Sequence, residues 1–165
     1  MSSFDITCEV DWPEVENAVN QATKELNNRF DFRGVECNIK IDQKGLLLTL
    51  ECSEDGKLDA MVDILQTKLV KRDVSLFGFE YQTPVPSSGR SVRQLIDVKS
   101  GIDKEKGKEI IKVIKESKIK VNPKMQGDSV RVNGSKRDDL QKVIQLIKTS
   151  QDSLKMALQT GNFRD

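Results

Sequence analysis

The 165-residue chain is predicted to be an α+β protein in which the arrangement β-α-β-β-α-β occurs twice. Apolar residues recur with strand and helix spacing in the same order in both halves of the sequence. Charge also separates the halves: residues 1–89 contain 9 Lys and Arg against 16 Asp and Glu, and residues 90–165 contain 18 against 10. The run from Thr83 to Arg90, rich in Pro, Ser and Gly, lies between them. The halves, with net charges of −7 and +8, are therefore predicted to be two small domains.

The first half is predicted to contain four strands and two helices. We expect the strands at residues 4–10, 35–41, 46–52 and 74–82, a helix that begins at Asp11, and a second helix at about residues 54–71. In the first strand Phe4, Ile6 and Cys8 alternate with polar residues, which is typical of a strand with one buried face. Asp11 is a typical helix N-cap, and Glu14 three residues later has the spacing of a capping box. The other segments follow from the same alternating and helical spacings.

The second half repeats this order with little sequence identity to the first. We expect strands at residues 92–99, 119–125 and 129–133, helices capped by Asp103 and Ser135, and a weak final strand within residues 154–164. This order is the ferredoxin-like arrangement, in which a four-stranded antiparallel sheet carries two helices on one face. We therefore expect tandem ferredoxin-like (RNP-like) domains, an acidic one at residues 1–83 and a basic one at residues 91–165. The other face of each sheet is then open to a ligand or a partner.

The composition limits the chemistry of the protein. The chain has no histidine, which excludes histidine-dependent catalytic triads and histidine metal ligands. Its three cysteines, Cys8, Cys37 and Cys52, form no Cys-x-x-Cys motif, so we expect small, unreactive, buried residues without a disulfide or a metal site. No apolar run is long enough for a signal peptide or a membrane span. We therefore expect a cytoplasmic protein that is not an enzyme, has no cofactor and binds no membrane.

Several sequence blocks resemble one known family. They are Ser3-Phe4-Asp5-Ile6, Asn28-Arg29-Phe30-Asp31-Phe32-Arg33-Gly34, Val92-Arg93-Gln94, Gly101-Ile102-Asp103-Lys104, Lys118-Ile119-Lys120-Val121, Ser135-Lys136-Arg137-Asp138-Asp139-Leu140 and Asn162-Phe163-Arg164-Asp165. On these blocks the chain resembles the YajQ family of bacterial nucleotide-binding proteins over essentially its whole length. The polar segment at residues 150–161 departs from the expected pattern, which leaves the length of the last strand open.

The resemblance implies both a fold and a function. It implies that the two domains exchange their first strands, so that residues 4–10 join the basic domain and residues 92–99 join the acidic one. Asp5 would then lie among basic residues of neighbouring strands, and opposite charges placed in this way stabilise a sheet. The function it implies is binding of a nucleotide ligand, with cyclic di-GMP first and ATP or GTP as further candidates. Ligand binding would then alter contact with a regulatory protein partner or with DNA.

Arg29, Asp31 and Arg33 form the first candidate ligand-binding site. Two arginines around a carboxylate, interleaved with Phe30 and Phe32, are suited to binding phosphate and stacking a purine. The alternative interpretation is a helix end, in which Arg29 lies near the negative end of the helix dipole and both phenylalanines pack in the core. Both interpretations remain open.

The second candidate site is a basic set in the second domain. Its members are Lys118, Lys120, Lys124 and Arg131, on the outward side of two predicted strands, and Lys136 and Arg137 at the start of the last helix. Such a set attracts phosphate groups, whether in a nucleotide or in RNA. The alternatives are a solvated sheet face without a ligand and an RNA- or tRNA-binding module. A third interpretation, an adaptor that joins proteins through its oppositely charged halves, predicts no nucleotide affinity.

An aromatic stripe is the third feature. Phe77, Phe79 and Tyr81 share one side of a predicted strand and would stack bases if that side were open. Burial of these rings in the core or between domains is the preferred interpretation. The strand at residues 46–52 carries no outward aromatic residue, which disfavours sequence-specific RNA recognition.

Overall fold

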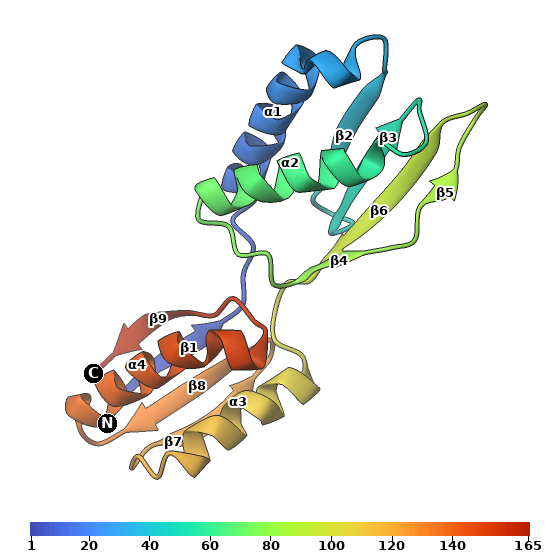
Figure 1. Ribbon diagram of the computed structural model, residues 1–165. Helices are drawn as coiled ribbons and strands as arrows, with labels where there is room; N and C mark the ends of the chain where they lie inside the picture. Colours follow the sequence, from blue (N-terminus) through green and yellow to red (C-terminus); the bar gives the residue numbers. More distant parts are fainter. The chain divides into compact units, whose positions relative to one another are not determined.

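The computed structural model describes residues 1–165 and contains four α-helices and two antiparallel β-sheets, which confirms the predicted α+β class (Figure 1). The helices are α1 (Trp12–Asn28), α2 (Leu58–Lys71), α3 (Lys104–Glu116) and α4 (Arg137–Leu154), with a short 3-10 helix, η1 (Phe30–Phe32). The strands are β1 (Ser2–Thr7), β2 (Cys37–Asp42), β3 (Leu47–Cys52), β4 (Phe79–Tyr81), β5 (Val85–Pro86), β6 (Val92–Val98), β7 (Asn122–Gln126), β8 (Ser129–Gly134) and β9 (Gln159–Arg164). None of the helices is both long enough and apolar enough to span a bilayer.

The chain forms two compact units, and each sheet belongs to one of them. Unit 1 consists of Met1–Glu9 and Ser100–Asp165, and unit 2 consists of Val10–Lys99. The pairing of β1 with β8 and β9 is consistent with mixing of strands between the two halves of the sequence. Unit 1 contains 15 Lys and Arg against 11 Asp and Glu, a net charge of +4, and unit 2 contains 12 against 15, a net charge of −3. The two units therefore differ less in net charge than the two halves of the sequence, residues 1–89 and 90–165.

The sheet of unit 1 has the strand order β7-β8-β1-β9. β1 is a central strand and runs antiparallel to both neighbours, with Phe4 opposite Val132 of β8 and Ile6 opposite Thr160 of β9. α3 and α4 pack on one face of this sheet (Figure 1). Phe4 and Ile6 are fully buried in the core between the sheet and the two helices. β1 therefore supplies part of a core that is otherwise built from the C-terminal part of the chain.

The sheet of unit 2 has the order β2-β3-β6-β4, and β5 pairs with β6. β6 is central, with Ile96 opposite Leu48 of β3 and Arg93 opposite Glu51. α1 and α2 cover one face and bury Leu48, Ile96 and Leu65 of α2 completely. The alternation of apolar and polar residues in these strands thus corresponds to a buried and an open face.

Two of the three residues of the predicted aromatic stripe, Phe79 and Tyr81, face the core of unit 2. Phe79 is buried, and Tyr81 packs partly buried against the same apolar cluster. The Tyr81 hydroxyl accepts a hydrogen bond from Gln66 Nε2 of α2 at 2.9 Å, so the ring lies on the helix-covered side. The preferred interpretation of these two rings as core residues is confirmed.

Two of the three predicted helix caps are confirmed. Asp11 Oδ1 accepts a hydrogen bond from the backbone N–H of Glu14 at 3.3 Å, and Asp103 Oδ1 accepts one from the N–H of Lys106 at 2.8 Å. The predicted Ser135 cap is wrong. α4 begins one residue later than that cap requires, and no side chain caps its first turn.

The strands predicted at residues 74–82 and 119–125 begin several residues later than the sequence pattern indicates. β4 begins at Phe79, because Asp73 and Gly78 have positive φ angles of 58° and 89° and interrupt the extended backbone. β7 begins at Asn122, because Lys118, with φ of 63°, ends the turn that follows α3. The last strand, β9, forms in spite of its polar sequence, because it pairs with β1 at the edge of the sheet.

Candidate functional site

A cavity of about 290 Å³ lies in unit 1 next to the edge strand β9. Its walls come from the start of β1, the end of β9 and the first turns of α4. The lining residues of α4 are Arg137, Leu140, Gln141 and Ile144, which recur at positions i, i+3, i+4 and i+7 and so share one helix face. Because this face meets strands from opposite ends of the chain, the cavity depends on the pairing of β1 with β9.

Phe163 forms a flat apolar surface in this cavity. Its ring stacks on that of Phe4, with 5.9 Å between the ring centroids and 29° between the ring planes. Phe4 is fully buried, whereas 61% of Phe163 is exposed, so a fixed ring supports an accessible one. The β1–β9 register shifts between Ser3 and Asp5, and Asn162 has φ of 53°, a local irregularity of the kind that redirects side chains. A planar ligand can therefore stack on the exposed part of Phe163.

Charged and polar groups surround this ring. Arg137 Nη2 lies 2.6 Å from Asp165 Oδ2, and the two side chains are 73% and 74% exposed. Arg164 also lines the cavity. Arg137 is the first residue of an 18-residue helix, whose free N–H groups and dipole favour an anion. With the hydroxyl groups of β1 and the Gln141 amide, the cavity offers an aromatic surface, two guanidinium groups, the Asp165 carboxylate and neutral hydrogen-bonding groups. The ring and the guanidinium groups suit a base and a phosphate.

The predicted basic set is divided by the structure. Arg137 lines the cavity, and Lys136 lies directly before it as the N-cap residue of α4. Lys118 and Lys120 are exposed but precede β7, so the prediction that they lie on the outward side of a strand is wrong. The left-handed turn at Lys118 ends the helix and delays the start of the strand.

Arg131, on the open face of the unit 1 sheet, forms an ion pair with the Asp5 carboxylate. Its Nε donates a hydrogen bond to Asp5 Oδ1 at 2.9 Å, and Asn162 Nδ2 donates one to Asp5 Oδ2 at 2.7 Å. The hydrogen bond from Arg131 is the largest cause of the lowered pKa of Asp5. Lys124 lies opposite Arg131 and is exposed. As the expected strand exchange implies, β1 places the Asp5 carboxylate beside a basic residue of the neighbouring strand, and this pairing lowers the positive charge of the sheet face.

Replacing Asp5 with Asn should destabilise unit 1 most at neutral pH. Because the pKa of Asp5 is lowered in the folded chain, the ion pair contributes fully above the unfolded pKa of about 3.9, and this contribution is lost as the pH falls through the folded pKa. The difference in melting temperature between the natural chain and Asp5→Asn should therefore be largest near pH 7 and shrink at pH 3. Thermal unfolding measured by circular dichroism at both pH values tests this. Asp152→Asn, at an exposed position of α4, is the control, and an Asp5→Asn effect of equal size at both pH values would contradict the prediction.

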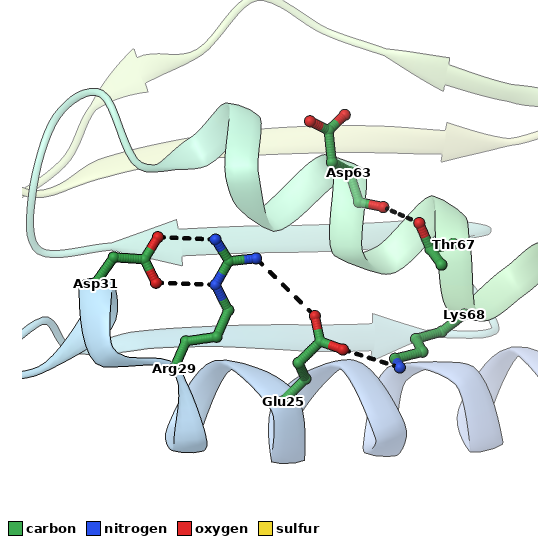
Figure 2. Close-up of polar contacts among 6 residues, drawn as sticks. All are labelled: Glu25, Arg29, Asp31, Asp63, Thr67 and Lys68. Carbon is green, nitrogen blue, oxygen red and sulfur yellow. Dashed lines mark hydrogen bonds and ion pairs between the residues drawn. The ribbon is translucent and has the colours of Figure 1, made fainter.

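Arg29, which follows α1 in unit 2, is held by two carboxylates (Figure 2). Its Nε and Nη2 donate hydrogen bonds to Asp31 at 2.9 and 2.8 Å, and its Nη1 lies 4.0 Å from Glu25 Oε2. Glu25 also pairs with Lys68 of α2 at 3.0 Å. The hydrogen bonds between Arg29 and Asp31 are the main reason that the pKa of Asp31 is lowered and that of Arg29 raised. These contacts link the end of α1 to α2 and leave Arg29 engaged within the protein.

The aromatic rings of Phe30 and Phe32, on either side of Asp31, differ in exposure. Phe32 is buried, as the helix-end interpretation predicts, but Phe30 is 79% exposed, so that interpretation is wrong for this ring. Within the single turn of η1 only one of the two rings faces the core. The guanidinium of Arg33 lies 5.0 Å from the centre of the Phe30 ring, and Lys57 Nζ lies 5.5 Å from that of Phe32. Of all the predicted ligand residues, only Arg137 lines the cavity of unit 1.

Among the lining residues of the cavity that sequence reasoning missed are Phe163, Arg164 and Asp165. They belong to the last block of the resemblance, and Ser3, which also lines the cavity, belongs to the first. Neither block falls on a helix or carries a recognisable ligand motif. One signal for these residues was present in the sequence: the two blocks lie at opposite ends of it. Pairing of the first and last strands would bring them together.

Known proteins match the chain over its whole length. A family model described as nucleotide-binding protein YajQ-like matches residues 2–164. The chain is 48% identical to a protein of Trichlorobacter lovleyi over 165 residues, which cover 100% of both chains, and 48% identical to one of Geotalea daltonii over 164 residues, which cover 99% of both. It is 49% identical to a protein of Syntrophotalea carbinolica over 148 residues, 90% of this chain and 91% of that one. All three relatives are named nucleotide-binding proteins.

Proposed function

The chain belongs to the family of YajQ-like nucleotide-binding proteins, and on this premise we propose that it binds a nucleotide without catalysing a reaction on it. The proposed site is the cavity of unit 1. The observation that carries the proposal is Phe163, an exposed ring that rests on a buried one and lies among the cavity residues Arg137 and Arg164. In this arrangement the base stacks on the ring and the guanidinium groups bind phosphate.

Cyclic di-GMP is the first candidate ligand, as the family resemblance implies. The cavity volume of about 290 Å³ is at the lower end of the range for small-molecule sites, roughly 300–1,000 Å³. We therefore propose that the cavity holds one base with its adjoining phosphate, and that the second half of the dinucleotide extends over the surface. ATP and GTP contain the same base–phosphate unit and are the further candidates. The liganded protein would act as an effector through a regulatory protein partner or DNA.

We also propose that units 1 and 2 are ferredoxin-like domains with exchanged first strands. If β1 is counted as the first strand of unit 1 and β6 as the first strand of unit 2, both sheets have the strand order 2-3-1-4. Each sheet carries its two helices on one face, which supports the same assignment. The exchange matters for the site, because it brings Ser2 and Ser3 of β1 to the cavity.

RNA or tRNA binding on the sheet face of unit 1 is the alternative function. The net charge of +4 of this unit and the exposed Lys124 favour contact with a polyanion. The pairing of Arg131 with Asp5, and the position of Lys118 and Lys120 outside the strands, reduce the free positive charge on that face. We therefore rank this function second.

Calorimetric titration of the full chain with cyclic di-GMP, GTP, ATP and a short RNA, each at two salt concentrations, tests the proposal. We expect a nucleotide to bind with a weak dependence on salt, because few phosphates are contacted. Binding of RNA would instead weaken steeply, because every neutralised phosphate releases counterions. If no nucleotide binds, the proposed function is wrong, and RNA binding alone with a steep salt slope would establish the alternative.

A further inference from the structure

Cys37 and Cys52 lie directly opposite each other on the neighbouring antiparallel strands β2 and β3 of unit 2. Residues opposite each other in a sheet point to the same face, and here that face is the one covered by α1 and α2. Cys52 belongs to the buried core, and Cys37 packs against that core from the edge strand. The two sulfur atoms are therefore on the same side of the sheet at the same register position.

The hydrogen-bond pattern shows which kind of pair this is. The next pair outward is Glu36 and Ser53, whose backbones are joined by the bond from Ser53 N to Glu36 O at 2.8 Å. Hydrogen-bonded and non-hydrogen-bonded pairs alternate along an antiparallel ladder, so Cys37 and Cys52 form a non-hydrogen-bonded pair. In such pairs the Cα atoms are about 4.5 Å apart, which is within the range of about 4.4–6.8 Å found in disulfides.

The two thiols differ in exposure. Cys52 is 1% exposed, whereas Cys37, on the edge strand, is only partly buried. Burial raises the pKa of the Cys37 thiol, and the neighbouring Cys52 raises it further, so only a small fraction of Cys37 is thiolate at neutral pH and its oxidation is slow. From this geometry we infer that Cys37 and Cys52 form a reversible intramolecular disulfide when the protein is exposed to hydrogen peroxide. The inference is independent of the proposed nucleotide site, which is in the other unit.

The chemistry requires one peroxide molecule for each disulfide. The Cys37 thiolate attacks hydrogen peroxide, so that an S–O bond forms, the O–O bond breaks and the hydroxide released takes up a proton to become water. The Cys52 sulfur then attacks the sulfur of the Cys37 sulfenic acid, forming the S–S bond and breaking the S–O bond, and a second water leaves. Two thiols and one peroxide thus give one disulfide and two waters. The accessible cysteine is oxidised first, and the buried one completes the bond.

Peptide mapping of the full chain after treatment with hydrogen peroxide tests the inference. Remaining thiols are blocked with N-ethylmaleimide, and the protein is digested with trypsin without reductant. Trypsin releases Cys37 in the peptide of residues 34–40 and Cys52 in that of residues 45–57. We expect these two peptides to be joined with the loss of two hydrogen atoms and to separate after addition of dithiothreitol. Because this measurement uses the natural chain, it does not depend on the folding of any variant.

Cys8 provides the matched control. It is also partly buried, but it lies in unit 1 and is not opposite another cysteine. Cys8→Ser should leave the joined peptides unchanged, whereas Cys37→Ser should abolish them. The inference is overturned if the peptides of Cys37 and Cys52 carry N-ethylmaleimide under conditions that oxidise Cys8, or if the bridge joins two chains and gives a dithiothreitol-sensitive dimer.

Discussion

Replacing Phe163 with Ala should weaken binding of the nucleotide ligand by roughly 5- to 150-fold, because stacking of one base on an aromatic ring contributes about 1–3 kcal/mol. The ring is 61% exposed and stacks on Phe4, so its loss removes the stacking surface and leaves the buried core residue in place. Titration calorimetry of Phe163→Ala with cyclic di-GMP, or with whichever nucleotide the natural chain binds, measures the effect. Its melting temperature should change little, because the side chain is mostly exposed.

Phe30→Ala is the matched control for this experiment. Phe30 is also a mostly exposed phenylalanine, with 79% of its surface accessible, but it belongs to unit 2 and contacts Arg33. Its replacement should leave nucleotide affinity unchanged. The opposite result, a loss of affinity in Phe30→Ala and none in Phe163→Ala, would move the site to the end of α1 and disprove its assignment to the cavity.

Replacing Phe4 with Ala should lower the free energy of unfolding of unit 1 by about 3–5 kcal/mol, the usual cost of removing a buried phenylalanine ring. Phe4 is fully buried in the core of unit 1, although most residues of that core lie about 100 or more positions later in the sequence. Hydrogen exchange should show the amides of α3 and α4 losing protection. Trp12, the single tryptophan, packs against the core of unit 2, so its fluorescence should report a much smaller change.

Ile96→Ala gives the reciprocal test. Ile96 is fully buried on β6 in the core of unit 2, and its truncation should cost about 2–5 kcal/mol in that unit. The unfolding transition seen by Trp12 should therefore shift to lower denaturant in this variant. If Phe4→Ala shifted the Trp12 transition as much as Ile96→Ala does, β1 would contribute to the stability of unit 2, and the assignment of β1 to unit 1 alone would be wrong.

The sequence predicts well those features whose causes are local. Asp11 and Asp103 act as helix caps because each side chain needs only an N–H three residues away. The alternation in β3 is clear because one of its faces is buried by two helices. Ser135 has the same spacing signal and fails, because α4 begins after Lys136 and leaves the hydroxyl outside the first turn.

The candidate site could not be predicted in the same way, because its causes are distant in sequence. Ser3 pairs with Arg164 across nearly the whole chain, and no local spacing reveals that pairing or the register shift beside it. Phe163 occurs in a polar segment with no apolar period, so nothing local shows that its ring rests on Phe4. Local spacing also does not reveal the ion pair between Arg131 and Asp5, and only the strand exchange implied by the family resemblance places Asp5 among basic residues. Charge composition identified the basic half of the chain but not which of its cations are free.

The placement of β1 has a consequence for how the protein folds during its synthesis. Translation produces Met1–Glu9 well before the strands that border this segment, β8 and β9. At elongation rates of about 5–20 residues per second, the delay is on the order of ten seconds. Val10–Lys99 can meanwhile collapse into its own sheet as the nascent polypeptide lengthens. Throughout that interval the leading segment, with its alternating apolar side chains, is the part of the growing chain most open to association with a neighbour.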